Sequence, residues 1–570
     1  MEGKLSNGLE NNILYALLWA GRFDELRDLA SKRPRSSTVD YFFLAAIAAK
    51  NGISEAVAQA GKRIPDEKDR TAALLTAGQT LLKLRLYKEA ADLIETAAAG
   101  GSQAATLRAS ATAIRKAQRY ETYMKTATTP MAALLRFFPV MFLTNVPPET
   151  VQSVFVQGSV LSKPDSLKAI RAAMAPFRSQ VAKAGVSLEV ATDIALGAIQ
   201  GKVDGDDSGY RIRADIAGPT GAQKMVVFIV LEAGEYRVVC LNAAGPLGAL
   251  ALKNLEAGKP DIARRWLDWA REIEQLKGGE DPLAGAPFPR FWSRGSDAPP
   301  ETIRYAAASL MANSEDAEQE EKAIPILAEG RAKAASPEDR LKFDLALAAA
   351  YSQTHKYELL LPIVRDLLQA HPDSESAFGL VVLALTKLKK SQDAMQVVNE
   401  RLARNPEDHA ALAVQVSIAM RDGDAEKSIE LGKKIIAAGS STPQDWNNMA
   451  WSFLMANRVT PEAIEFAQKG VYATQSSAFG VLHTLAALYA ETGKTTEARE
   501  VILQAMEVAG QEEPEDNSWY VFGRIDEQYG ITSDALAAYR RVSKPSTDEG
   551  LAGSSWAIAQ RRLATLERAQ

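Results

Sequence analysis

The sequence holds little of what metal centres and disulfide-stapled folds need. It has one cysteine, Cys240, and four histidines among 570 residues. A single thiol excludes an internal disulfide and any site built from several cysteines. None of the histidines lies at metal-ligand spacing from another or from Cys240; they are His355, His371, His409 and His483. We therefore predict no metal and no cofactor, and we interpret Cys240 as a small hydrophobic residue of an apolar strand.

An excess of charge of one sign is also missing. The chain carries 66 lysines and arginines against 71 aspartates and glutamates, for a net charge of −5, and the signs are intermixed along the sequence. Nucleic-acid-binding domains carry a basic patch or stripe, so this balance predicts no nucleic-acid partner.

Long hydrophobic runs are absent too. The most membrane-like segment, from Met131 to Val146, contains Arg136 and Pro139. It is shorter than the roughly 20 apolar residues that a membrane-spanning helix needs. The apolar run at 14–20 is short and lacks the cleavage site of a secretory signal. We expect a cytoplasmic protein without a transmembrane segment; a periplasmic location stays open if an upstream leader or domain is missing from this chain.

No catalytic motif is present. The sequence has no nucleophile elbow or comparable Ser, His and Asp arrangement. The segment from Gly218 to Lys224 superficially resembles a phosphate-binding loop, but its lysine does not follow the second glycine. We interpret this segment as a hairpin loop and predict that the chain is not an enzyme.

One acidic stretch has part of the spacing of a calcium loop. Positions 1, 3, 5, 6 and 12 of such a loop are filled, but Arg211 stands where an apolar residue is usual and a strand pattern follows. An acidic turn is the better interpretation. The residues at calcium-loop positions are Asp204, Asp206, Ser208, Gly209 and Asp215.

What the sequence does contain is a repeat. Leu347 and Ala348 are matched 34 residues later by Val381 and Val382, and later positions recur at the same period. Further units start at 409, 443, 479 and 516. The pattern resembles the tetratricopeptide repeat of bacterial proteins, in which each unit is a pair of antiparallel helices. The resemblance implies a mostly α fold, an α-solenoid in which each unit packs only on its neighbours.

Between 102 and 245 the repeat stops and a period of two appears. Tyr210, Ile212, Ala214 and Ile216 alternate with charged neighbours, which indicates a half-buried strand. The apolar stretch at 224–242 predicts two more strands around a turn. We therefore predict a small α+β module with a three-stranded antiparallel meander inserted in the solenoid.

This reading divides the chain as follows. Residues 1–101 form degenerate helical hairpins, 102–245 the inserted module of three helices and three strands, 246–276 another hairpin, 277–300 a linker rich in proline and glycine, 301–340 an irregular helical pair, 341–550 the regular array of six units, and 551–570 a capping helix. Aromatic residues of the linker, Phe288, Phe291 and Trp292, are expected to pin it onto neighbouring helices.

The tryptophans of the array fall into two classes. Trp446 occupies a core position of its unit, whereas Trp451 occupies one that faces the concave groove of a tetratricopeptide superhelix. Asparagines beside Trp451 suit hydrogen bonds to an extended peptide backbone. The predicted groove residues are Lys387, Arg421, Asn447, Asn448, Trp451, His483, Tyr520, Arg524 and Glu527.

These features predict a non-catalytic scaffold or adaptor that binds a protein or peptide in the groove. Two alternatives stay open. The chain is the C-terminal accessory binding region of a larger bacterial enzyme, for example one with a transglutaminase-like domain, or the inserted module binds a small ligand. An apolar pocket lined by both helices and meander would favour the small-ligand alternative. The oligomeric state is not predicted, and the step from repeat fold to role is an analogy.

Overall fold

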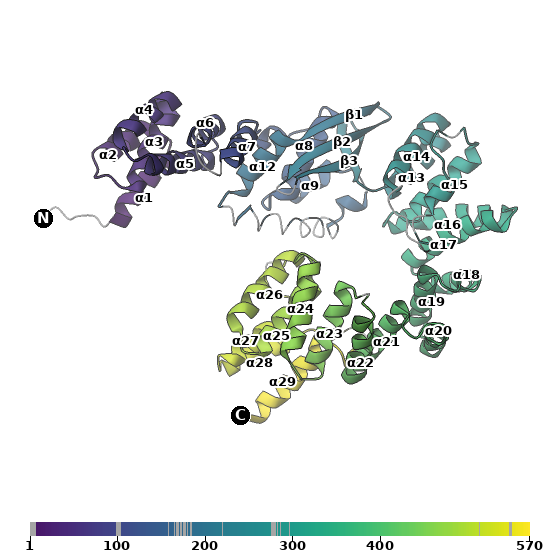
Figure 1. Cartoon of the computed structure of the whole chain (residues 1–570). Helices are drawn as coiled ribbons and strands as arrows, with labels where there is room; N and C mark the ends of the chain where they lie inside the picture. The colour runs from purple at the N-terminus through teal and green to yellow at the C-terminus, as the bar shows by residue number, and fades with distance from the viewer. Residues whose placement is uncertain are drawn as a thin grey trace. The chain divides into compact units, whose positions relative to one another are not determined.

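The structure is a computed structural model. It describes residues 7–98, 104–157, 159–164, 185–218, 221–274, 287–295, 297–439, 441–511, 513–545 and 550–569, with single residues between 166 and 182 and between 281 and 284. The chain forms two compact units, residues 1–162 with 177–241, and residues 163–176 with 242–570 (Figure 1).

The first unit begins with helices that pack in sequence order. They are α1 (Asn7–Trp19), α2 (Phe23–Ser31), α3 (Ser37–Asn51), α4 (Ile53–Arg63), α5 (Glu67–Lys83), α6 (Tyr87–Ala97) and α7 (Ala104–Arg115). Polar caps set their starts: Ser36 accepts a hydrogen bond from the Val39 N–H at α3, and Asp66 accepts one from the Asp69 N–H at α5. Gly78 lets α5 and α6 approach closely, because a Cβ there would lie 2.8 Å from Ile94 Cγ1.

The inserted module follows α7. Its helical elements are η1 (Tyr120–Thr122), α8 (Pro130–Phe142), α9 (Pro148–Val154), η2 (Val160–Ser162) and α12 (Leu188–Ala198), and its strands are β1 (Gln200–Asp206), β2 (Gly209–Gly218), β3 (Gly221–Glu232) and β4 (Glu235–Leu241). The four strands form one antiparallel sheet in the order β1-β2-β3-β4. The prediction of three strands is therefore wrong by one, because β1 combines residues predicted as the end of a helix with residues predicted as an acidic turn.

The apolar helix α8 packs on this sheet. Val227, Phe228 and Ile229 of β3 are completely buried, and Phe137 of α8 meets Phe155 edge-to-face at 6.0 Å between ring centroids. This sheet contact explains why the segment looks membrane-like in sequence. Within the described parts of the chain, every helix is too short or too polar to cross a bilayer.

The second unit opens with irregular helical pairs. They are α13 (Gly245–Glu256), α14 (Pro260–Glu274), η3 (Phe288–Arg290), α15 (Pro300–Met311) and α16 (Ala317–Lys333). In the proline-rich segment, Phe288 and Trp292 are buried, and the Trp292 Nε1–H donates to Asp268 Oδ1 at 2.9 Å. Phe291 packs edge-to-face on Phe343 at 5.1 Å. These aromatic residues hold residues 287–295 against the neighbouring helices, as predicted.

The regular array follows as consecutive helical pairs, α17 (Pro337–Gln353) with α18 (Tyr357–Ala370), α19 (Glu375–Lys387) with α20 (Ser391–Arg404), α21 (His409–Asp422) with α22 (Ala425–Ala437), α23 (Pro443–Met455) with α24 (Pro461–Ala473), α25 (Phe479–Glu491) with α26 (Thr495–Ala509), and α27 (Ser518–Gln528) with α28 (Thr532–Arg541). A further helix, α29 (Ser555–Ala569), follows α28 (Figure 1). The predicted fold class, a mostly α helical-repeat fold with a small inserted antiparallel sheet, is confirmed.

Candidate partner-binding groove

All of the predicted groove residues lie on the first helix of a pair. Lys387 ends α19, Arg421 belongs to α21, Asn447, Asn448 and Trp451 to α23, His483 to α25, and Tyr520, Arg524 and Glu527 to α27. This position is what the groove prediction requires, since the first helices line the inner face of a tetratricopeptide array. Their surroundings differ from what the repeat pattern alone predicts.

Trp451 is covered by the chain's own C-terminal segment, which we define as residues 550–569. Its side chain is 9% exposed, and its indole N–H donates to the Gly553 carbonyl oxygen at 2.8 Å. Gly553 fits because it has no side chain: a Cβ would lie 2.1 Å from the Met420 carbonyl oxygen. Ala552 is also close to Gly423, where an added Cβ would meet its methyl at 2.7 Å. The segment therefore lies in close contact with the ends of α21 and α23.

Helix α29 continues this contact. Arg561 donates from Nη1 to the carbonyl oxygen of Met455, the last residue of α23, at 2.9 Å. Ile558 and Leu563 are buried in the same apolar cluster as Trp451. The helix packs on α28, and it also contacts α27 and the end of α23. Trp446, expected in the core, is partly buried against this cluster.

A half-buried charge cluster joins α25, α27 and α29. Arg524 forms ion pairs with Glu491 Oε2 at 2.9 Å and with Glu527 Oε2 at 3.3 Å. Arg562 of α29 binds Glu527 with both Nε and Nη2. Burial raises the pKa of Glu527, but the hydrogen bonds from Arg562 and Tyr539, together with the nearby guanidinium charges, outweigh burial and hold that pKa below its ordinary value. Glu527 therefore holds helix α29 through Arg562, and Arg524 links Glu527 to Glu491.

Tyr520 and His483 lie inside the protein. Tyr520 is completely buried, and its hydroxyl donates to Glu491 Oε1 at 2.5 Å. His483 is 5% exposed, and its Nε2 lies 3.0 Å from the Asn517 carbonyl oxygen, so this nitrogen carries the proton. Burial lowers the pKa of His483. The expectation that both side chains are open to a partner needs correction, because neighbouring units and their loops bury them.

The remaining predicted residues are more open. Lys387 is exposed, and Arg421 is half-buried and paired with Asp422 Oδ1 at 3.0 Å. Asn448 accepts a hydrogen bond from Gln444 at 2.6 Å. The Oδ1 of half-buried Asn447 is buried and has no hydrogen-bond partner among the described residues. Because this oxygen is buried, a partner's backbone N–H can reach it only if the surrounding side chains move.

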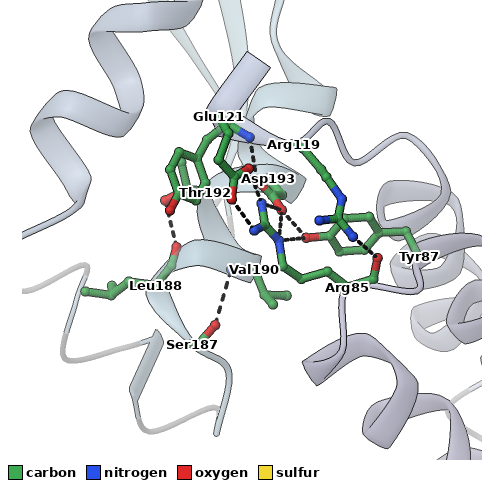
Figure 2. A network of polar contacts seen from close by, with 10 residues as sticks. Arg85, Tyr87, Arg119, Glu121, Ser187, Leu188, Val190, Thr192 and Asp193 are labelled. Atoms are coloured by element: carbon green, nitrogen blue, oxygen red, sulfur yellow. Dashed lines mark hydrogen bonds and ion pairs between the residues drawn. The ribbon is translucent and has the colours of Figure 1, made fainter. Parts of the chain in front are cut away.

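A second polar network, which sequence reasoning missed, lies in the first unit. Asp193 of α12 is completely buried and accepts hydrogen bonds from Arg85 Nε at 2.7 Å, from the Tyr120 backbone N–H at 2.8 Å, and from the Tyr87 hydroxyl. Arg85 also binds Glu121. Figure 2 shows Arg85 and Tyr87 reaching from the α5–α6 turn toward Asp193. The network ties a helical hairpin to the inserted module.

The residues at calcium-loop positions lie on a β-hairpin. Asp204 belongs to β1 and pairs with Arg211 of β2, and Asp206 accepts hydrogen bonds from the backbone and side chain of Ser208. Asp206 and Gly209 are directly opposite each other in the sheet. Across the described residues, no group of three or more His, Cys, Asp or Glu side chains is placed to hold a metal ion.

Comparisons with known proteins find likeness at the level of structure. No protein-family model matches the chain, and no curated protein matches it. A tetratricopeptide repeat protein from Parabacteroides merdae is 14% identical, with 56% of this chain and 98% of that chain covered and a TM-score of 0.28. Yeast Tom70 is 9% identical, covering 93% and 95%, with a TM-score of 0.31.

The Cut9–Hcn1 hetero-tetramer of the APC/C is 12% identical, covering 99% of this chain and 92% of that chain, with a TM-score of 0.30. At these TM-scores the likenesses identify no partner, so the assignment rests on the helical pairs and repeat period of this chain. The described residues form consecutive antiparallel helical pairs of a tetratricopeptide-like fold.

Proposed function

We propose that the protein is a non-catalytic scaffold that binds an extended segment of a protein partner across α21, α23 and α27. The C-terminal segment of the same chain shows which chemistry this surface accepts. The surface holds this segment through the Gly553 backbone carbonyl, through packing on Trp451, and through the ion pair of Arg562 with Glu527. Main-chain hydrogen bonds and shape-selected small residues are a recurring mode of peptide recognition.

The observation that carries this proposal is the close fit at Gly553. The indole of Trp451 donates to its carbonyl at 2.8 Å, and the Met420 carbonyl leaves no room for a side chain. A surface that accepts glycine alone at one position and holds its backbone selects sequence as well as shape. A partner that binds here competes with the chain's own segment. We therefore expect the free surface to bind peptides that the intact protein excludes.

The test uses a fluorescently labelled synthetic peptide of residues 550–566 and fluorescence anisotropy. Gly553→Val in the full chain forces its own segment off the surface, because the new side chain collides with Met420. The variant is then expected to bind the peptide. The wild type is expected to bind it roughly 100-fold more weakly, since a tethered segment at about 1 mM effective concentration competes with a peptide of about 10 µM affinity.

Matched controls separate this effect from a general loss of structure. Gly379→Val places the same substitution in α19, where an added Cβ meets nothing within 4 Å, and it is expected to behave as wild type. A peptide carrying valine at position 553 is expected to bind neither protein. The proposal fails if folded Gly553→Val protein, verified by circular dichroism, binds no peptide, or if wild type and variant bind it equally.

The sequence also suggested an accessory region of a larger enzyme, a cytoplasmic location and the binding of a small ligand. The accessory-region hypothesis and the cytoplasmic location remain predictions. Binding of a small ligand by the module together with the solenoid has one specific observation in its favour, a cavity in the first unit, which is developed next.

A further inference from the structure

The first helices of the N-terminal pairs enclose a cavity of about 620 Å³. Helices α1, α3, α5 and α7 form its sides, α6 contributes Ile94, and α12 of the inserted module closes it. No strand of the sheet lines it, so the cavity differs from the pocket between helices and meander that the sequence suggested. Its volume lies in the range of about 300–1,000 Å³ that is typical of small-molecule sites.

The interior of the cavity is apolar and the rim leaves a large aromatic ring uncovered. Leu18, Ile94, Ile114 and Val190 line it and are at most 5% exposed. Trp19, also a lining residue, is 61% exposed. This exposed indole ring stands beside an apolar cavity. An apolar group that enters the cavity contacts both the buried apolar lining residues and the Trp19 ring.

Most polar groups of the lining are already satisfied. The hydroxyls of Tyr15 and Tyr41 bind each other at 3.1 Å. Thr76 and Thr80 donate to carbonyl oxygens of their own helix, at 2.9 and 2.7 Å. These groups make no demand on a ligand, so they favour apolar material in the interior.

The polar groups that remain free lie at the exposed rim. Gln79 and Lys83, one turn apart on α5, and Ser110 on α7 are exposed lining residues without a partner among the described residues. Lys83 is the only charged side chain in the described lining, which contains no carboxylate. The lining also includes Ser187, the N-cap of α12, where the helix dipole is positive. The local field therefore favours one negative charge at the rim.

We propose that this cavity binds an amphipathic small molecule with an apolar body and a single carboxylate, the body inside and the carboxylate on Lys83. A partner helix is the competing occupant. Two turns of α-helix, about 11 Å long and 10 Å across, fill roughly 850 Å³, which exceeds the cavity. A chain of ten or so methylenes with one carboxylate fits both the size and the charge. The inference is independent of the proposed function, because the cavity lies in the other compact unit.

The test is equilibrium dialysis of radiolabelled decanoate against the full-length protein, far below the micelle concentration. We expect one decanoate per chain. The cationic analogue decyltrimethylammonium has a similar apolar chain and is expected to bind at least tenfold more weakly. Lys83→Met is expected to weaken decanoate binding about tenfold, the effect of a lost charge-assisted contact. Lys68→Met changes an exposed lysine at the start of the same helix, outside the cavity, and is the matched control.

A cavity-filling variant tests the location. Ala113→Phe adds a ring from α7 and is expected to abolish binding. If that variant does not fold, Ser110→Trp adds bulk at an exposed lining position where the fold tolerates it. The proposal is overturned if folded wild type binds no decanoate, if the filling and Lys83 variants bind as wild type does, or if the cationic chain binds equally. It is also overturned if an acidic amphipathic helical peptide binds the cavity and decanoate does not displace it.

Discussion

Replacing Asp193 with alanine is expected to destabilise the first unit strongly while leaving its surface unchanged. Asp193 is completely buried and paired with Arg85 at 2.5 Å, and it also accepts from Tyr87 and from the Tyr120 N–H. Removing one partner of a buried ion pair costs about 3–5 kcal/mol, since the other charge stays in a desolvated site. Arg85 keeps Glu121, which reduces this cost, but the orphaned backbone N–H adds about 1 kcal/mol. The net expectation is about 3–4 kcal/mol.

Hydrogen exchange followed by mass spectrometry resolves the affected unit. Amides of α5, α6 and α12 are expected to exchange roughly 100- to 1,000-fold faster, since 1.4 kcal/mol corresponds to a factor of ten. Amides of α17 to α28 are expected to stay unchanged. Asp92→Ala is the matched control: its partner Arg115 is exposed, so the loss is expected to stay below about 1 kcal/mol.

A rescue distinguishes charge burial from mere loss of packing. Replacing Asp193 by leucine and Arg85 by methionine together removes both charges and is expected to recover most of the stability lost in the single variant. A change below 1 kcal/mol on Asp193→Ala would refute the reasoning. So would faster exchange spread equally over both units.

Two further predictions concern close packing and pH. Gly197→Ala is expected to lower the melting temperature of the first unit, because the added Cβ would lie 1.9 Å from the Lys116 carbonyl oxygen. Gly61→Ala in α4 adds a Cβ that meets nothing within 4 Å, and it is expected to stabilise the fold by about 0.5–1 kcal/mol. Thermal unfolding of both variants checks the sign of each effect. His483 has a folded-state pKa below its ordinary value near 6.5, so the unfolded chain binds the proton first and stability falls as pH drops below about 6.5. Urea unfolding at pH 7.5 and 5.5 is expected to show a pH-dependent loss for wild type that His483→Gln reduces, and an equal loss in both proteins would contradict this origin.

The helical pairs could be predicted because their signals are local. Ser374, Asp408 and Thr442 each accept a hydrogen bond from a backbone N–H in the first turn of the helix that follows. Those helices begin at 375, 409 and 443, the residues where the repeat period placed new units. A period of 34 residues fixes which face is apolar and which residues recur, so architecture follows from the sequence alone.

The first strand could not be predicted because its partner makes it a strand. Residues 200–206 are exposed throughout and contain glycines and acids instead of alternating apolar residues. β2 supplies the hydrogen bonds that extend this segment, from Gln200 opposite Asp215 to Asp206 opposite Gly209. Strand formation at such an edge depends on its neighbour more than on its own composition.

The contacts around the candidate site could not be predicted from the sequence for a related reason. The position of Trp451 on the inner face follows from the repeat, but its cover, Gly553, lies 102 residues further along the chain. Asp193 and Arg85 are separated by 108 residues. A local sequence pattern does not encode such distant pairs, because the repeats of an array normally contact only their neighbours. Only the folded chain shows which surface residues are already occupied.

The C-terminal segment also determines when the surface around Trp451 becomes covered during synthesis. Domains fold as they emerge, at about 5–20 residues per second. The 102 residues between Trp451 and Gly553 therefore take roughly 5–20 s to translate. During that interval helices α24 to α28 are also being synthesised, and the indole of Trp451 still lacks the Gly553 carbonyl that accepts its hydrogen bond. Until residues 550–553 have been synthesised, the surface around Trp451 is open to other peptide segments.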